Sequence, residues 1–237
     1  MTRAPERYEE GWIFHPEACE GARVTMESSE SQHLHRVLRL RSGTLCTVTD
    51  GQGSIYDGVL ALSDPRACEL EVGAKVGSQE RPRLSMAQAL LKVRGIEDVF
   101  ELCAQTPLRA FQPLWSEHCQ LPKGSDMAGQ LDRLRRKASS AICQSKQAWV
   151  CEILAPLEFK QFVAQFPADE TLWMCDGDGR DTPQPKTNGW IAIGPEGGFS
   201  AAELGQAKDA GATLLSLGHT RLRAVAAGLY ALGRLSA

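Results

Sequence analysis

A change near residue 80 in the pattern of expected secondary structure constrains the fold of this chain more than any other feature. Residues 22–76 run in short β-type segments separated by Gly, Asp and Pro, which favours a small barrel or meander. From Leu84 to Leu235, strand-like and helix-like segments alternate, which is typical of a parallel sheet with helices on both faces. The polar segment GSQERPR, residues 77–83, lies between them. We therefore predict a β domain over residues 1–77 and an α/β domain over residues 78–237.

One helix is expected inside the β domain. In SESQHLHRVLRLRSG, Leu34, Val37 and Leu38 recur at helical spacing behind Ser29 or Ser31, either of which can serve as the N-cap. The same segment carries Arg36, Arg39 and Arg41. From composition alone, such a charge run more often marks a solvated helix face than a phosphate contact.

Composition places the chain among ordinary folded proteins, because 43% of its 237 residues are hydrophobic and 23% are charged. No run approaches the roughly 20 apolar residues of a membrane span, and the start lacks a secretory signal, so we expect a cytoplasmic protein. The eight cysteines are scattered, and we expect them to be reduced and mostly buried. Neither the cysteines nor His33, His35 and His118 have metal-site spacing, so no metal is expected.

The segment WIAIGPEGGFSAAEL is the most informative stretch for function. A buried-type strand runs into a Pro/Gly loop and then into a helix, with Ser200 and Glu203 spaced as a capping box. Gly194, Gly197 and Gly198 allow positive φ and a close approach to a ligand, and ligands bind where strands of an open α/β sheet end. The spacing matches neither a Walker loop nor GxGxxG. On the glycines alone, a purely structural turn is the alternative interpretation.

A second strand, glycine turn and helix follow in LLSLGHTRLRAVAAGLYALGRL. Residues 216–218 form another backbone-rich turn, and the following helix reads as a buried, alanine-rich helix. Arg223 fits that structural interpretation poorly, because a charged group that enters an apolar helix tends to have a partner or a functional role.

Taken in order, HLHRVLRLRSG, GPEGGFSAAE and LGHTRLR resemble the RsmE family of ribosomal RNA methyltransferases over nearly the whole chain. The resemblance implies an N-terminal PUA-like barrel that binds RNA and a C-terminal SPOUT domain with a trefoil knot. It implies an S-adenosyl-L-methionine cofactor, methylation of uridine N3 in small-subunit ribosomal RNA, and a homodimer that presents RNA from one chain to the site of the other.

Carried over to this chain, the resemblance implies three groups of site residues. Arg223 would hold the uracil oxygens while negative charge develops. The RNA contacts would come from Arg7, Arg36, Arg39 and Lys92. The cofactor would be surrounded by Met174, Ile193, Gly194, Pro195, Glu196, Gly197, Gly198, Ser216, Leu217, Gly218 and Leu222.

The chain departs from the family pattern on the substrate side. Where the family resembles LRTETA, this chain has Ala224, Val225 and Ala226 after LR, and where the family resembles SERS, residues 116–119 read SEHC. KATELG and EQSxR are likewise replaced by LCAQTP and CQSKQ. Two alternatives follow: a silent or retargeted RNA-binding protein of the same fold, and an unrelated α/β enzyme that binds an anion at a helix N-terminus.

Overall fold

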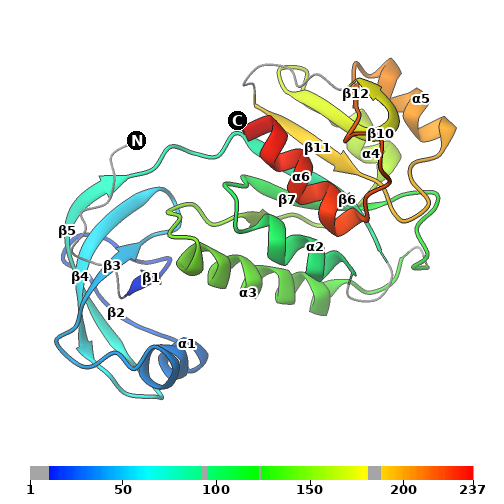
Figure 1. Ribbon diagram of the computed structural model, residues 1–237. Helices are drawn as coiled ribbons and strands as arrows, with labels where there is room; N and C mark the ends of the chain where they lie inside the picture. Colours follow the sequence, from blue (N-terminus) through cyan, green and yellow to red (C-terminus); the bar gives the residue numbers. More distant parts are fainter. Residues whose placement is uncertain (1–10, 92–94, 123, 181–187, 237) are drawn as a thin grey trace. The chain divides into compact units, whose positions relative to one another are not determined.

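The chain folds into two compact units in a computed structural model that describes residues 11–91, 95–122, 124–180 and 188–236 (Figure 1). The first unit contains the chain up to Arg81 together with Ser139–Val150, and the second contains Pro82–Ala138 and the chain from Cys151 onward. The sequence predicted one boundary after residue 77, with residues 139–150 in the second domain.

The first unit is a curled five-stranded sheet with the strand order β1-β3-β4-β5-β2 (Figure 1). β1 is parallel to β3, and the other neighbours are antiparallel. The strands are β1 Trp12–Phe14, β2 Arg23–Thr25, β3 Leu45–Thr49, β4 Ser54–Leu62 and β5 Glu69–Ser78. Alternate residues face one side of a strand, and that side buries a core that includes Val48, Leu60 and Leu70. The β-type segments predicted over residues 22–76 are therefore confirmed as β2 to β5, while β1 lies before that region and was not predicted.

The predicted helix of the first unit is present, but its predicted N-cap is wrong. It consists of α1 (Ser28–Gln32) and a π-helical turn, η2 (His33–Val37). The helix begins after Glu27 without a side-chain cap. Ser31 is buried inside it, where its hydroxyl donates to the Met26 carbonyl at 3.1 Å and accepts from the Cys68 N–H at 2.9 Å. Ser31 therefore joins the helix to the sheet.

The segment Ser139–Val150 is bonded into the first unit. The Ala148 carbonyl accepts hydrogen bonds from the Gly53 N–H at 2.8 Å and the Thr49 hydroxyl at 3.2 Å, and the Ala148 N–H donates to the Gln79 side chain at 2.7 Å. The Trp149 ring lies so close to Gly53 that a Cβ there would collide with it. The sheet is thus completed by residues far along the chain.

The second unit is built on a seven-stranded sheet in which every pairing is parallel. Its order is β12-β10-β11-β6-β7-β8, and β9 also pairs with β7. The strands are β6 Leu84–Ala89, β7 Ala110–Trp115, β8 Glu152–Ile153, β9 Leu157–Glu158, β10 Thr171–Arg180, β11 Gly189–Ile193 and β12 Thr213–Leu215. The helices are α2 Gly95–Cys103, α3 Ala128–Gln144, α4 Phe159–Ala164, α5 Ala201–Asp209 and α6 Ala224–Ser236, and the last residues of α3 belong to the first unit.

Helices cover both faces of this sheet, as predicted (Figure 1). On one face, Phe162 of α4 and Ala207 of α5 pack with Ala87 and Ala192 of the strands. The other face holds α2 and α6, where Phe100 of α2 meets Phe111 of β7 edge-on at 5.0 Å between ring centroids. Because both faces are covered, the central strands β6 and β7 are buried along their whole length. None of the helices within the described ranges is long and apolar enough to span a membrane.

Candidate functional site

The candidate site lies at the edge of the parallel sheet where β10, β11 and β12 end. β10 lies between the other two, with Met174 opposite Ala192 of β11 and Leu214 of β12. Since the strands are parallel, the loop that follows β11 and the turn that follows β12 leave from the same edge of the sheet. Both predicted glycine segments therefore meet where ligands bind in open α/β sheets.

The loop after β11 owes its shape to three glycines with different roles. Gly198 has φ of +74°, and its N–H donates to the Pro195 carbonyl at 2.9 Å, which closes a tight turn. At Gly194 a Cβ would crowd the Gly198 backbone at 3.1 Å, and at Gly197 it would meet the His118 side chain at 3.2 Å. Only Gly198 therefore uses the positive φ expected of all three. The other two allow the chain to approach itself closely.

The capping box at the start of α5 is confirmed. The Ser200 hydroxyl accepts from the Glu203 N–H at 3.2 Å, and the Glu203 carboxylate accepts from the Ser200 N–H at 2.9 Å. The same carboxylate accepts from the Glu117 N–H at 2.9 Å and the Ser116 hydroxyl at 3.4 Å. Glu203 is buried. It therefore joins the loop to the segment that follows β7.

The sequence did not assign a role to His118, which follows β7 at the same edge. Its Nδ1 lies 3.0 Å from the Gly198 carbonyl oxygen, and its side chain is exposed. A carbonyl can only accept, so in the neutral ring Nδ1 carries the hydrogen and Nε2 presents its lone pair. The position of His118 directly after a buried strand of the predicted sheet is the signal that would have found it.

The turn after β12 is held by two arginines that follow it in the chain. Gly218 has φ of +105°, and its N–H donates to the hydroxyl of buried Ser216 at 3.2 Å. The Arg234 guanidinium donates to the Ser216 carbonyl at 2.9 Å, and that of Arg221 donates to the Glu196 carbonyl at 2.8 Å. Arg221 thus ties the turn to the loop after β11.

Met174, which was predicted to lie beside the cofactor, has a different place in the structure. The Met174 side chain is fully buried in the core, so it is not presented at the site. The chain beyond it comes back toward β12, and at Gly179 a Cβ would collide with the Ser216 N–H. The backbone near Gly179 therefore lies beside the turn.

Gln88, at the end of β6, is a supporting residue that the sequence did not single out. It is fully buried, and its side-chain amide donates to the Ala89 carbonyl at 2.9 Å and lies 3.4 Å from the carbonyls of Ile193 and Gly194. A polar residue inside the otherwise apolar segment LSMAQALL was the available signal. Its contacts hold the start of the loop.

Residues 79–236 match the family described as the RNA methyltransferase domain. The chain is also 33% identical to the ribosomal RNA small subunit methyltransferase E of Synechocystis over 235 residues, which are 95% of this chain and 76% of that protein. This chain belongs to that methyltransferase family. The resemblance seen in the motifs is therefore confirmed, and the protein is an RNA methyltransferase.

Two solved structures share the fold of this methyltransferase. The ribosomal RNA small subunit methyltransferase E of Neisseria gonorrhoeae, bound to S-adenosyl methionine, has a TM-score of 0.86 at 22% identity and covers 95% of this chain and 96% of its own. A Legionella pneumophila methyltransferase, solved with the same cofactor, has a TM-score of 0.85 at 23% identity with the same coverage. They confirm the predicted two-part fold, a curled N-terminal sheet followed by a parallel α/β domain. In the α/β domain the chain passes from edge strand β12 to α6, which packs on α2, β6 and β11.

The residues predicted on the substrate side of the methyltransferase belong to both units. Arg223 is exposed directly before α6, and its carbonyl accepts from the Ala227 N–H at 2.8 Å. Arg36 and Arg39 are exposed in the first unit. Arg7 and Lys92 lie outside the described residues. The described part of the chain holds no group of three or more His, Cys, Asp or Glu side chains arranged to bind a metal.

The cysteines of the methyltransferase are free thiols, and most are shielded. Burial raises the pKa of Cys46 and of Cys103 to about 12. Cys19 is exposed, and the other seven are buried or partly buried, in line with the expectation. It is therefore the thiol open to reagents.

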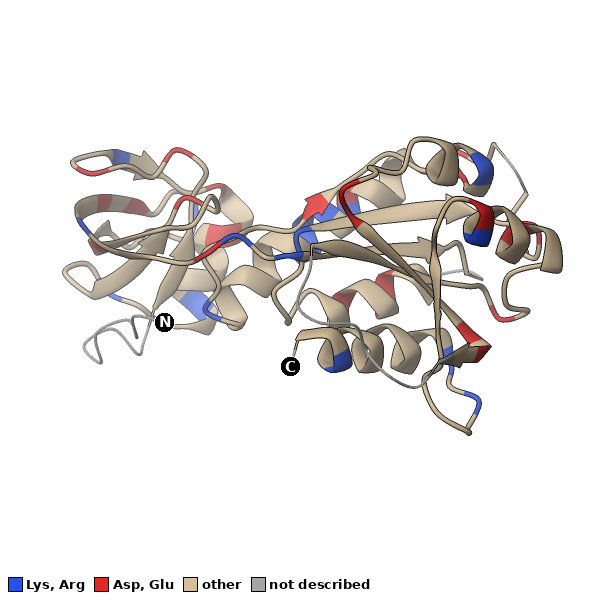
Figure 2. Ribbon diagram, turned by 90° about the horizontal axis from the view of Figure 1, so that it is seen from above, with Lys and Arg blue, Asp and Glu red and all other residues tan. Residues whose placement is uncertain are grey.

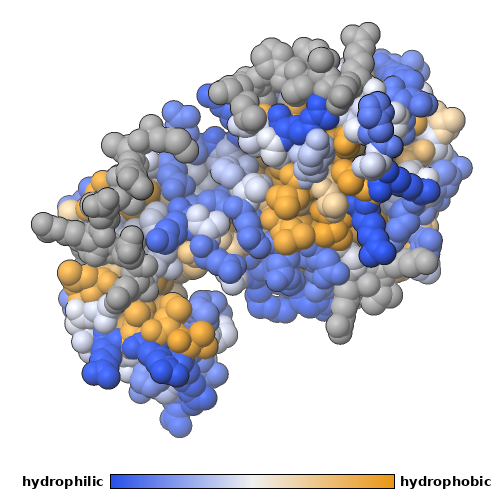
Figure 3. All heavy atoms as spheres, in the orientation of Figure 1, coloured by the Kyte–Doolittle hydropathy of each residue, from blue (hydrophilic) through white to orange (hydrophobic). Residues whose placement is uncertain are grey.

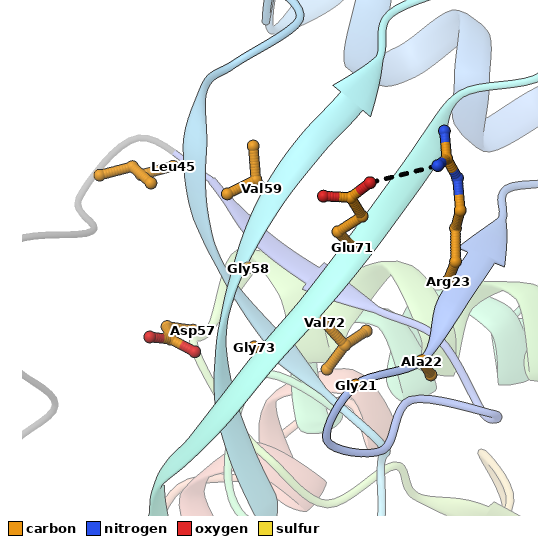
Figure 4. A pocket seen from close by; sticks show the side chains of 10 residues that line it. All are labelled: Gly21, Ala22, Arg23, Leu45, Asp57, Gly58, Val59, Glu71, Val72 and Gly73. Carbon is orange, nitrogen blue, oxygen red and sulfur yellow. Dashed lines mark ion pairs between the residues drawn. The ribbon is translucent and has the colours of Figure 1, made fainter.

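A pocket of about 480 Å³ lies in the first unit of the methyltransferase, and its lining includes none of the predicted site residues. Arg23 and Glu71 form an ion pair of 3.2 Å on its wall, whereas Asp57 points away from them (Figure 4). Asp57 Oδ1 is buried without a hydrogen-bond partner among the described residues. The lining is Gly21, Ala22, Arg23, Leu45, Asp57, Gly58, Val59, Glu71, Val72 and Gly73.

Proposed function

We propose that this enzyme transfers the methyl group of S-adenosyl-L-methionine to N3 of a uridine in small-subunit ribosomal RNA. The names of the relatives and the cofactor bound in the two solved structures support this proposal. The observation that carries it is the pair of glycine loops at one sheet edge, tied together by the hydrogen bond from Arg221 to the Glu196 carbonyl. An enzyme that methylates ribosomal RNA acts where ribosomes are made, so we propose that it is cytoplasmic.

The cofactor site is made mainly of backbone. The N–H and C=O groups of two loops can read the edge of an adenine, and apolar side chains cover its face. The proposed residues are Met174, through its backbone, with Ile193, Gly194, Pro195, Glu196, Gly197, Gly198, Ser216, Leu217, Gly218 and Leu222. Leu222 is partly exposed beside the turn and is suited to cover an adenine ring.

Arg223 is the proposed electrostatic residue for the uracil ring. It is exposed at the entry to α6, two residues after the arginine that joins the loops. A guanidinium stabilises negative charge that develops on uracil oxygens as N3 loses its proton. The Arg223→Ala variant should lose turnover while its affinity for S-adenosyl-L-methionine stays within about twofold, measured by single-turnover methyl transfer and calorimetry. An unchanged rate would remove Arg223 from the mechanism.

The first unit is the proposed RNA-binding domain, with Arg36 and Arg39 among its contacts. Arg39 has φ of +54°, and a left-handed conformation at a non-glycine residue is enriched at functional sites. The preceding π-helical turn exposes 66% of Val37, which places an apolar group beside the two arginines. Lys and Arg are interspersed with Asp and Glu on both units (Figure 2), so the grip on phosphate is expected to be local. Arg7 and Lys92 complete the proposed set.

A homodimer is the proposed assembly, with α6 at its interface. Ala226, Leu229, Tyr230 and Gly233 recur at helical spacing on the exposed side of α6. Leu102 of α2 is 39% exposed, and Figure 3 shows an apolar patch over these two helices. A second copy of the chain would cover this stripe. The Tyr230→Glu variant should then elute as a monomer, and an unchanged dimer would refute the interface.

The deciding experiment is transfer of labelled methyl from S-adenosyl-L-methionine to small ribosomal subunits that lack the modification, followed by mass mapping. Label on uridine N3 supports the proposal. Label on another nucleotide indicates a changed target. Cofactor binding without transfer indicates the silent RNA-binding protein suggested by Ala224, Val225 and Ala226.

A further inference from the structure

Methylation at uridine N3 leaves one proton to be removed, and few groups at the site can take it. This question rests on the proposed function. The guanidinium groups of Arg221, Arg223 and Arg234 stay protonated in proteins and cannot act as bases. The Glu203 carboxylate already accepts from two backbone N–H groups and the Ser116 hydroxyl. The carboxylate is buried, and its oxygens are occupied by the hydrogen bonds that hold the loop.

His118 has the geometry of a proton acceptor. Its Nδ1 is held 3.0 Å from the Gly198 carbonyl oxygen, and its Cβ lies against Gly197. The carbonyl fixes the tautomer with hydrogen on Nδ1, so the basic lone pair of Nε2 is free. The ring is exposed, and it packs against the loop proposed to bind the methyl donor. A side chain larger than hydrogen at position 197 would displace it.

We propose that His118 is the general base of the methyl transfer. Nε2 takes the proton from uridine N3, and the N3 electron pair forms the new bond to the methyl carbon. The carbon–sulfur bond breaks, and its electrons remain on sulfur, which leaves S-adenosylhomocysteine. The imidazolium then releases its proton to water, because the ring is exposed. No other reactant is required.

Charged groups of both signs lie in the segments around His118. Glu117 is its chain neighbour, Glu196 lies in the loop packed against it, and Glu203 accepts from the Glu117 N–H. Arg221 reaches that loop through the Glu196 carbonyl, and His219 and Arg223 lie in the segment after β12. The role proposed for His118 therefore rests on the position and the tautomer of its ring.

The test uses the full-length enzyme and a His118→Asn variant. The Asn amide can still donate to the Gly198 carbonyl, but it has no basic nitrogen. We expect affinity for S-adenosyl-L-methionine to stay within about twofold and the single-turnover rate to fall by about 100-fold or more. The wild-type rate should decrease toward acidic pH, and the variant should lose that dependence. His15→Asn, which removes an imidazole from the first unit, is the matched control and should match wild type.

Two further variants separate catalysis from loop support. Imidazole in the buffer should restore part of the rate to His118→Ala, which a purely structural role does not predict. His118→Arg should be as slow as His118→Asn, because its guanidinium cannot accept a proton. A fully active His118→Asn or His118→Arg, or a His118→Ala that loses cofactor affinity and is not rescued, would overturn the proposal. Failure of the proposed function differs from all of these, because the wild-type enzyme itself would then leave uridine N3 unmethylated.

Discussion

Replacing Glu203 with alanine should destabilise the second unit and loosen the loop before α5. The substitution removes the acceptor of two backbone N–H groups, those of Ser200 and Glu117, each at 2.9 Å. A buried donor left without a partner costs about 1–3 kcal/mol. Because Glu203 is 8% exposed, water can partly replace the carboxylate. We therefore take the lower half of that range for each of the two donors and expect a total of about 2–4 kcal/mol.

Urea unfolding measures this loss, since Trp115, Trp173 and Trp190 all report on the second unit. The control is Glu101→Ala, which breaks an ion pair with Lys137 in the same unit. The Glu101 side chain is 59% exposed, and an exposed pair contributes at most about 1 kcal/mol. Affinity for S-adenosyl-L-methionine should fall only in Glu203→Ala. Equal free energies of unfolding for the two variants would refute the tethering role of Glu203.

Five other outcomes are expected. Arg39→Gly and Arg39→Ala should weaken RNA binding equally in a filter assay, while Arg39→Gly is more stable by about 1 kcal/mol because a left-handed backbone penalises a Cβ. Arg221→Ala should weaken cofactor binding about tenfold in calorimetry, since a hydrogen bond to a charged group contributes about 1.5–3 kcal/mol. Trp149→Ala should make residues 11–81 more sensitive to limited proteolysis while the second unit stays resistant. At pH 8, Cys19 should react first with a thiol reagent, and Cys19→Ser should lose that phase, because the raised pKa of the buried thiols keeps them protonated. Above about pH 9 the free energy of unfolding should fall, because the thiols of the unfolded chain ionise at a lower pH than the buried thiols of the folded chain.

The elements that sequence predicted well are those whose signals are local. β4, Ser54–Leu62, lies in the β region predicted over residues 22–76, because its residues largely alternate between core and surface. The capping box of Ser200 and Glu203 fixed the start of α5 because both partners lie within one turn. The order of strands and helices in the second unit followed from the same kind of short-range pattern.

The features that sequence missed depend on contacts between distant residues. The bonds of Ala148 to Gly53 and Thr49 join positions about a hundred residues apart, so no local pattern shows that residues 139–150 complete the first sheet. The left-handed backbone at Arg39 is equally invisible in composition, because most residues with positive φ are glycine or asparagine. Here tertiary contacts, not local preference, decide the conformation.

The glycine motifs and the side chains that hold them contain different information. The motifs specify a backbone that can approach a ligand, and Gly198 and Gly218 supply the positive φ this requires. The side chains of His118, Arg221 and Arg234 then hold that backbone through single hydrogen bonds to carbonyls. A carbonyl accepts from any suitable donor, so these supports can change identity while the loops keep their shape. This explains how a chain that departs from its family at residues 116–119 and 224–226 retains both loops. The catalytic base is therefore to be sought among the side chains that hold the loops, and not among the glycines that shape them.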